Sequence, residues 1–189
     1  MAQRINSRTK GSRNERSVAD VMKQWTGYEF ARTPQSGGLH WKKKNTTGDV
    51  ICIDEKHGLR FPLTIECKAH HDLDFSYMLD GTMGKKTNKI IHFWDQALRE
   101  SEEVNKIPML TIRRNGMPKD THFIVFQSFF INPLLEKNMG IIFEYGVMTY
   151  TNRSTNLKLT IMNSRDLVKL DYTSFYKYSK KFLRNGKKK

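Results

Sequence analysis

Residues 48–69 constrain the fold more than any other part of this sequence. They contain two apolar runs rich in β-branched residues, Val50–Ile53 and Leu63–Ile65, on either side of a polar segment that carries Gly58. Two such runs around a glycine-containing turn are typical of a β-hairpin. We therefore expect an antiparallel pair of strands over residues 49–69.

The charges of this hairpin are unusual for an apolar strand pair. Asp49 opens the first strand, and Glu66 and Lys68 lie on the second strand. Because alternate residues of a strand share a face, Glu66 and Lys68 are expected to point to the same side of the sheet. The cysteines of the two strands, Cys52 and Cys67, are at core-like positions, which favours buried free thiols over a disulfide or a metal site.

The chain has a large excess of basic residues. It holds 33 Lys and Arg against 19 Asp and Glu, a formal charge of +14 over 189 residues. Any one basic cluster can serve solubility alone, but the excess recurs at the start of the chain, on both sides of the hairpin and in residues 177–189. This pattern favours a polyanionic partner, with nucleic acid ahead of an acidic membrane surface. No stretch approaches the roughly 18 apolar residues of a membrane span, and the first residues lack a signal-peptide core, so we expect a cytoplasmic protein.

A helix is expected near the N-terminus, after a flexible basic arm over residues 1–11. Ser12 and Glu15 have the spacing of a capping box, and Gly27 is a natural stop. An apolar stripe at helical spacing follows Ser12: Val18, Val21, Met22 and Trp25. Glu15 can be read in two ways, because it is either the capping partner or an acid on the face that packs against the sheet. A buried acid is costly unless it is paired or bound to a cation.

The remaining pattern predicts an α/β fold with a mixed sheet. A short strand over 28–32 leads to a polar, glycine-rich loop over 32–38, and a loop with a short helical piece near 75–79 follows the hairpin. Further elements are expected as a helix over 88–105 and strands over 107–112 and 121–130. Residues 131–189 are expected to elaborate the same unit, with strands over 140–151 and 157–162 and a helix over 166–184. The predicted division is a core over 1–130 and a C-terminal α/β elaboration with a basic tail over 131–189.

The acids and the lysine of the hairpin suit phosphodiester hydrolysis. Mg²⁺ is held by a few carboxylate oxygens together with water, which Asp49 and Glu66 can supply, with the backbone carbonyl of Cys67 as an extra ligand. Lys68 can orient the attacking water and stabilise developing negative charge. Glu15 can hold a second ion directly or through water. The alternative metal cluster His70-His71-Asp72-Asp74 lacks a second ligand pair at zinc-like spacing, and Trp94 lies on a helical stripe that indicates core rather than base stacking.

The spacing D-x₁₆-E-x-K, with a glutamate on an upstream helix, resembles the PD-(D/E)xK nuclease superfamily. Residues 10–113 are most similar to the archaeal-type Holliday-junction resolvases and their phage relatives. The matching segments are Lys10–Arg16, Arg32–Gly38, Gly48–Ile51 and Ile65–Lys68. Three lysines before Asp49 and the added residues 131–189 depart from those compact resolvases.

This resemblance implies a restriction-endonuclease-like core, a mixed central sheet flanked by helices. It implies metal binding at Asp49 and Glu66, catalytic support from Lys68 and an acid role for Glu15. It also implies a homodimer, and for a phage protein the host cytoplasm. Together with the basic clusters it gives the following residues for DNA contact: Arg13, Arg16, Arg32, Ser36, Lys42, Lys43 and Lys44.

The expected function is that of a Mg²⁺-dependent DNA endonuclease, with Mn²⁺ able to substitute. Branched DNA, such as a Holliday junction, is the expected substrate, in recombination, repair or phage DNA processing. Two alternatives stay open: a restriction- or repair-type nuclease on linear duplex, and a catalytically inactive DNA-binding protein on the same fold.

Overall fold

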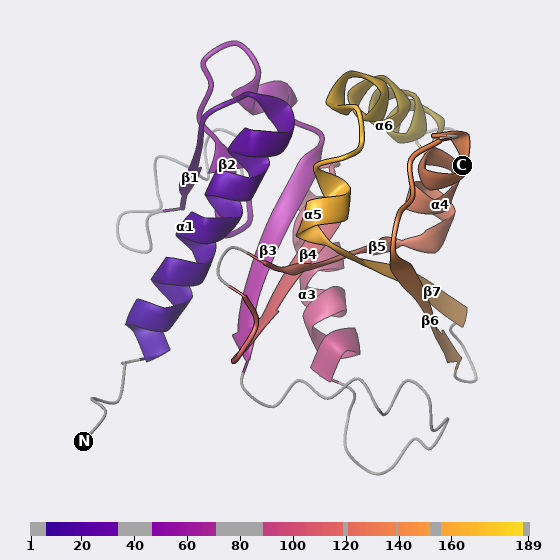
Figure 1. The fold of residues 1–189 in the computed structure, drawn as a ribbon. Helices are drawn as coiled ribbons and strands as arrows, with labels where there is room; N and C mark the ends of the chain where they lie inside the picture. The colour runs from indigo at the N-terminus through magenta and orange to yellow at the C-terminus, as the bar shows by residue number, and fades with distance from the viewer. Residues whose placement is uncertain are drawn as a thin grey trace.

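The computed structural model describes residues 7–33, 47–70, 89–118, 121–138, 140–151 and 156–186. One mixed sheet of seven strands forms its centre, in the order β1-β2-β3-β4-β5-β7-β6 (Figure 1). The strands are Phe30–Arg32 (β1), Val50–Cys52 (β2), Leu63–His70 (β3), Ile107–Arg114 (β4), Phe123–Gln127 (β5), Tyr145–Thr151 (β6) and Asn156–Asn163 (β7). This is the predicted α/β class with a mixed sheet, and it is consistent with a restriction-endonuclease-like fold.

The predicted pairing of the two apolar runs is confirmed. β2 is antiparallel to β3, with Val50 opposite Ile65, and a short 3-10 helix (η1, Gly58–Arg60) lies in the connection. β3 and β4 are parallel over their whole length, from Leu63 opposite Ile107 to His70 opposite Arg114. A parallel pair needs a long crossover connection, and here that connection contains helix α3 (Lys89–Glu103).

Helices cover both faces of the sheet. α1 (Ser7–Thr26) buries Val18 and Met22 against one face, together with alternate residues of β3 and β4 such as Ile65 and Met109. On the other face, α3 buries its apolar stripe against the intervening residues of β4 and β5. The buried residues of that second cluster include Ile90, Trp94, Ala97, Leu110, Ile112 and Val125. The period of two along the strands therefore separates the two cores.

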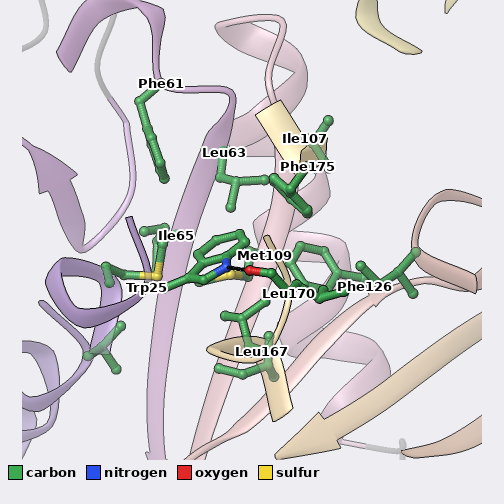
Figure 2. Close-up of a cluster of buried hydrophobic side chains, with 14 of the residues drawn as sticks. Trp25, Phe61, Leu63, Ile65, Ile107, Met109, Phe126, Leu167, Leu170 and Phe175 are labelled. Carbon is green, nitrogen blue, oxygen red and sulfur yellow. Dashed lines mark hydrogen bonds between the residues drawn. The ribbon is translucent and has the colours of Figure 1, made fainter. Parts of the chain in front are cut away.

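The C-terminal elements pack on the same face as α1. They are α4 (Ser128–Lys137), α5 (Ser164–Leu167) and α6 (Tyr172–Gly186). The indole Nε1 of Trp25 donates a hydrogen bond to the carbonyl oxygen of Leu170 at 2.9 Å, and its ring meets Phe175 edge-on at 4.7 Å between centroids (Figure 2). An N-terminal helix and a C-terminal segment thus share one hydrophobic core.

The capping-box interpretation of Ser12 and Glu15 is wrong. α1 begins at Ser7, so both residues lie inside the helix, and residues 7–11 of the expected flexible arm are helical as well. The backbone N–H groups near Glu15 are more than four residues from the helix start, and no side-chain cap is needed there. The carboxylate of Glu15 instead accepts a hydrogen bond from Arg32.

Further boundaries differ from the sequence prediction. The strand expected over 140–151 begins at Tyr145. The strand expected over 121–130 ends at Gln127, and α4 starts at Ser128, because the buried residues Phe130, Ile131, Leu134 and Leu135 follow helical rather than strand spacing. The helix expected over 166–184 is two helices, α5 and α6. The helical piece expected near 75–79 lies outside the described residues.

Other expectations are confirmed. Cys52 and Cys67 are free thiols, the first buried and the second partly so, and Trp94 is fully buried. Among the described residues, no helix has both the length and the apolar character that crossing a membrane requires.

Candidate functional site

Asp49 is tied to β3 by its backbone and by its side chain. Its N–H donates to the carbonyl oxygen of Ile65 at 2.8 Å, and its Oδ2 accepts from the N–H of Cys67, also at 2.8 Å. The preceding residue, Gly48, has φ +99°, and a Cβ there would lie 2.7 Å from the Ile65 oxygen. Only glycine allows this close approach, which places the Asp49 carboxylate beside the strand that carries Glu66 and Lys68.

Glu66 and Lys68 point toward α3, where they meet Gln96. The Nζ of Lys68 contacts Oε1 of Glu66 and donates to Oε1 of Gln96 at 2.9 Å. The Nε2 of Gln96 donates to Oε1 of Glu66 at 2.8 Å and to Oε1 of Glu100 at 3.0 Å. Glu66 is only 2% exposed, so these bonds hold its carboxylate in a fixed place away from bulk water.

Burial and neighbouring negative charge raise the pKa values of Asp49 and Glu66, the two acids of the hairpin. Burial raises the pKa of Asp49, with further increases from Glu15 and Glu100, while the Cys67 N–H and Lys68 act in the opposite direction. Burial, followed by the charge of Asp49, raises the pKa of Glu66 to about 7 against the lowering effect of Lys68. Both acids therefore lie where a cation would favour their charged forms.

Glu15 reaches the site from α1. It is 8% exposed, and its Oε2 accepts a hydrogen bond from the Nε of Arg32 on β1 at 2.7 Å. Because Glu15 also contributes to the raised pKa of Asp49, its carboxylate acts on the same site. The structure thus holds Glu66 and Lys68 in contact on β3 and Asp49 against the backbone of Cys67 between them, and Glu15 approaches from α1, near enough for its charge to act on Asp49.

Asp49 and Glu66 are the two described carboxylates of the hairpin that could hold a metal ion. Within the described residues, no three or more His, Cys, Asp and Glu side chains form a group that could hold a metal ion. Mg²⁺ keeps several waters and takes one or two carboxylates, which Asp49 and Glu66 can provide. A cation bound between them would favour the charged forms of these two acids, whose pKa values are raised.

The residues expected to contact DNA are only partly described. Arg13 and Arg16 lie exposed on α1, and Arg32 is paired with Glu15. Ser36 and the lysines 42–44 lie outside the described residues, as do residues 71–74 of the alternative metal cluster. DNA contact by the described arginines also stays a prediction.

Gln96 and Glu100 were missed as site residues by sequence reasoning. They lie one turn apart on α3, beside the buried stripe, and look like ordinary polar residues of an amphipathic helix. The available signal is topological: a crossover helix between β3 and β4 must pack on a face of β3, and Glu66 and Lys68 occupy the face it covers.

Comparison with known proteins agrees with the geometry. Residues 6–177 match the model of a family described as "Phage putative PDDEXK endonuclease". The chain is also 30% identical over 111 residues to Protein D14 of Escherichia phage T5, a match over 59% of this chain and 66% of that protein, just under two thirds of its length. No solved structure matches the chain. Since the family model covers most of the sequence and the acids and lysine of the motif meet at one place, this chain belongs to the phage PDDEXK endonuclease family.

Proposed function

We propose that this protein is a Mg²⁺-dependent DNA endonuclease that hydrolyses phosphodiester bonds in branched DNA. One observation carries the proposal: two carboxylates with raised pKa values, the half-buried Asp49 and the buried Glu66, lie beside a lysine that is hydrogen-bonded to Glu66. A purely structural ion pair needs one acid and one base. It does not need a second acid that repels the first at the end of an apolar strand pair.

Asp49 and Glu66 would hold the metal ion, with the Cys67 carbonyl as a further donor. Bound there, Mg²⁺ would neutralise charge on the attacked phosphate and activate water. The Cys67 N–H fixes the Asp49 carboxylate, and Gln96 fixes that of Glu66, so the two acids are oriented before substrate arrives. Glu15 would hold a second ion directly or through water, and Arg32 keeps its carboxylate in place.

Lys68 would act on the attacking water and on the phosphate. Its Nζ lies between Glu66 and Gln96, which present it as a positioned ammonium group at the end of β3. A cation there stabilises negative charge that develops on the phosphate oxygens, and it orients the water through its N–H donors.

One observation supports DNA as the substrate, and another supports branched DNA in particular. The chain carries a formal charge of +14, which favours extended contact with the phosphate backbone of DNA. Its motif segments also resemble those of Holliday-junction resolvases, whose task requires paired cuts. A symmetric dimer would place one active site at each of the two cuts, so we propose that the protein is a homodimer. We propose that it acts in recombination, repair or phage DNA processing.

The decisive test is Asp49→Asn assayed with Mg²⁺ and with Mn²⁺. Loss of one carboxylate oxygen ligand should abolish cleavage, while DNA binding in EDTA stays near the wild-type level because the basic contacts remain. Asp95→Asn, an exposed position on α3, is the matched control and should cleave normally. Undiminished cleavage by Asp49→Asn would refute the site assignment.

The substrate is tested with a panel of four-way junction, flap, linear duplex and single-stranded DNA. Preferred cutting of the junction supports the proposal, and equal or better cutting of duplex supports a restriction- or repair-type nuclease instead. Salt-dependent binding without cleavage by either metal would support an inactive DNA-binding protein.

A further inference from the structure

A basic groove lies beside the candidate site, between α1 and the turn that follows β4. Its volume is about 500 Å³, and five cationic side chains line it against one acid, Asp20. The cationic residues are Lys10, Arg13, Arg16, Arg113 and Arg114. A concave surface with this balance of charge has a positive potential, and so attracts anions.

On both α1 and β3, a residue that lines the groove is the sequence neighbour of a residue of the candidate site. Its lining includes Asn14, which precedes Glu15 on α1, and Ala69, which follows Lys68 on β3. Because neighbouring strand residues point to opposite faces, Ala69 faces α1 while Lys68 faces α3. From Lys10 to Asp20 the groove follows about 15 Å of helix, the length of roughly four base-pair steps along one DNA strand.

The cations of the groove divide into two groups, those engaged within the protein and those that are not. Lys10 belongs to the first group, because its Nζ donates to Oδ1 of Asn115. The guanidinium of Arg113 donates to the carbonyl oxygens of Thr121 at 2.9 Å and Met117 at 3.2 Å, so it holds the turn together. Arg13, Arg16 and Arg114 are exposed, and none of the described residues forms an ion pair with them. As far as the described residues go, these three cations are available to a ligand.

Asn14 provides an independent reason to expect a ligand in the groove. Its side chain lines the groove and is 4% exposed, yet its Oδ1 has no hydrogen-bond partner in the described part of the chain. A buried amide without a partner is costly, and such groups are usually satisfied by water or by a ligand. The amide can accept from a sugar or base donor, or turn over and donate its NH₂ to a phosphate oxygen.

We propose that this groove, which we call the α1 groove, binds the sugar-phosphate backbone of DNA a few nucleotides from the phosphate that is cut. The inference rests on the proposed nuclease function. Arg13, Arg16 and Arg114 contact successive phosphates, Asn14 contacts the same strand, and Arg113 shapes the wall. The DNA therefore runs from the α3 face of β3, where Lys68 points, past the strand end to the α1 face.

The test compares two double variants, each made in the Asp49→Asn background so that no cleavage interferes. Arg13→Gln/Arg114→Gln removes two free cations of the α1 groove. Lys56→Gln/Arg60→Gln removes the same charge from exposed positions before the start of β3, at the far end of that strand. Binding of a fluorescein-labelled DNA duplex is measured by anisotropy at NaCl concentrations between about 50 and 200 mM.

The groove variant should bind about tenfold more weakly or worse. The slope of log K against log salt should fall by about 0.9 for each phosphate that the variant no longer neutralises. The control variant should match its parent. The charge reversal Arg114→Glu should weaken binding further than Arg114→Gln.

Equal affinities and salt slopes for the groove and control variants would overturn the proposal, provided that the parent binds DNA. Tighter binding of an RNA duplex, abolished in the groove variant, would also overturn it by assigning the groove to another nucleic acid. Absence of DNA binding by the parent protein would instead refute the proposed nuclease function itself.

Discussion

The side chain of Gln96 donates a hydrogen bond from its Nε2 to Oε1 of Glu66 at 2.8 Å, which links α3 to the strand that carries the E-x-K motif. The same amide accepts from Lys68 through its oxygen, at 2.9 Å. One residue thus fixes both the acid and the lysine, and it does so with the two ends of a single planar group.

Gln96→Ala should lower the cleavage rate about 10- to 100-fold, the range typical of residues that orient ligands of a metal site. DNA affinity in EDTA should stay unchanged, because Gln96 has no phosphate role in the proposed site. Glu102→Ala, at an exposed position of the same helix, is the matched control. If both variants cleave like wild type, Gln96 has no part in positioning the site.

The metal-free protein should lose stability as the pH rises from about 5 to 8. The pKa of Glu66 is about 7 in the folded protein and near 4.5 in the unfolded chain, so the folded state retains a proton that the unfolded state has released. The contribution of Glu66 to stability is fully present below its pKa in the unfolded chain. It is lost as the pH rises through its pKa in the folded protein. The difference between the two pKa values of Glu66 corresponds to about 3 kcal/mol of folding stability.

Urea unfolding in EDTA at both pH values measures this loss, and Glu66→Gln is the comparison. The variant should lose less stability than wild type between pH 5 and 8, because its amide does not titrate. Mg²⁺ should raise the stability of wild type at pH 8 and have little effect on the variant. Parallel pH curves for the two proteins would contradict the assignment.

The strand pair and its charges were predictable from sequence because they depend on local patterns. Alternation placed Glu66 and Lys68 on one face, and the apolar runs fixed the pairing that brings Asp49 to β3. Gln96 was not predictable in the same way, since its role arises only when α3 crosses over to the face that the E-x-K residues occupy. The misread capping box has a similar origin, because a local S-x-x-E match carries no information on whether the helix already extends upstream.

The ion pair between Glu15 and Arg32 should stabilise the protein through the buried partner. The side chains are 10% and 27% exposed, respectively, so removing Arg32 leaves a largely buried carboxylate without its cation. Arg32→Met should destabilise the protein by about 1–3 kcal/mol, and Glu15→Gln/Arg32→Met should recover part of that loss. A double-mutant cycle by thermal unfolding measures the coupling, and additive effects would show that the pair contributes nothing.

Gly48→Ala should damage both stability and cleavage, because this glycine sets the position of Asp49. Its φ of +99° is unfavourable for a residue with a side chain, and the added Cβ would lie 2.7 Å from the Ile65 oxygen and 3.0 Å from the Ile65 nitrogen. The backbone must shift, so we expect a loss of about 2–4 kcal/mol. A displacement of Asp49 by about 1 Å would cost cleavage about 100-fold.

Gly27→Ala separates strain from displacement. Gly27 also has positive φ, +76°, but it ends α1 with none of the described atoms within 4 Å of the added Cβ. This variant should lose about 1 kcal/mol of stability and cleave at the wild-type rate, since it moves no site residue. Cleavage assays under conditions where both variants are folded make the comparison. Equal activity of the two would mean that the close approach of Gly48 to β3 does not position Asp49.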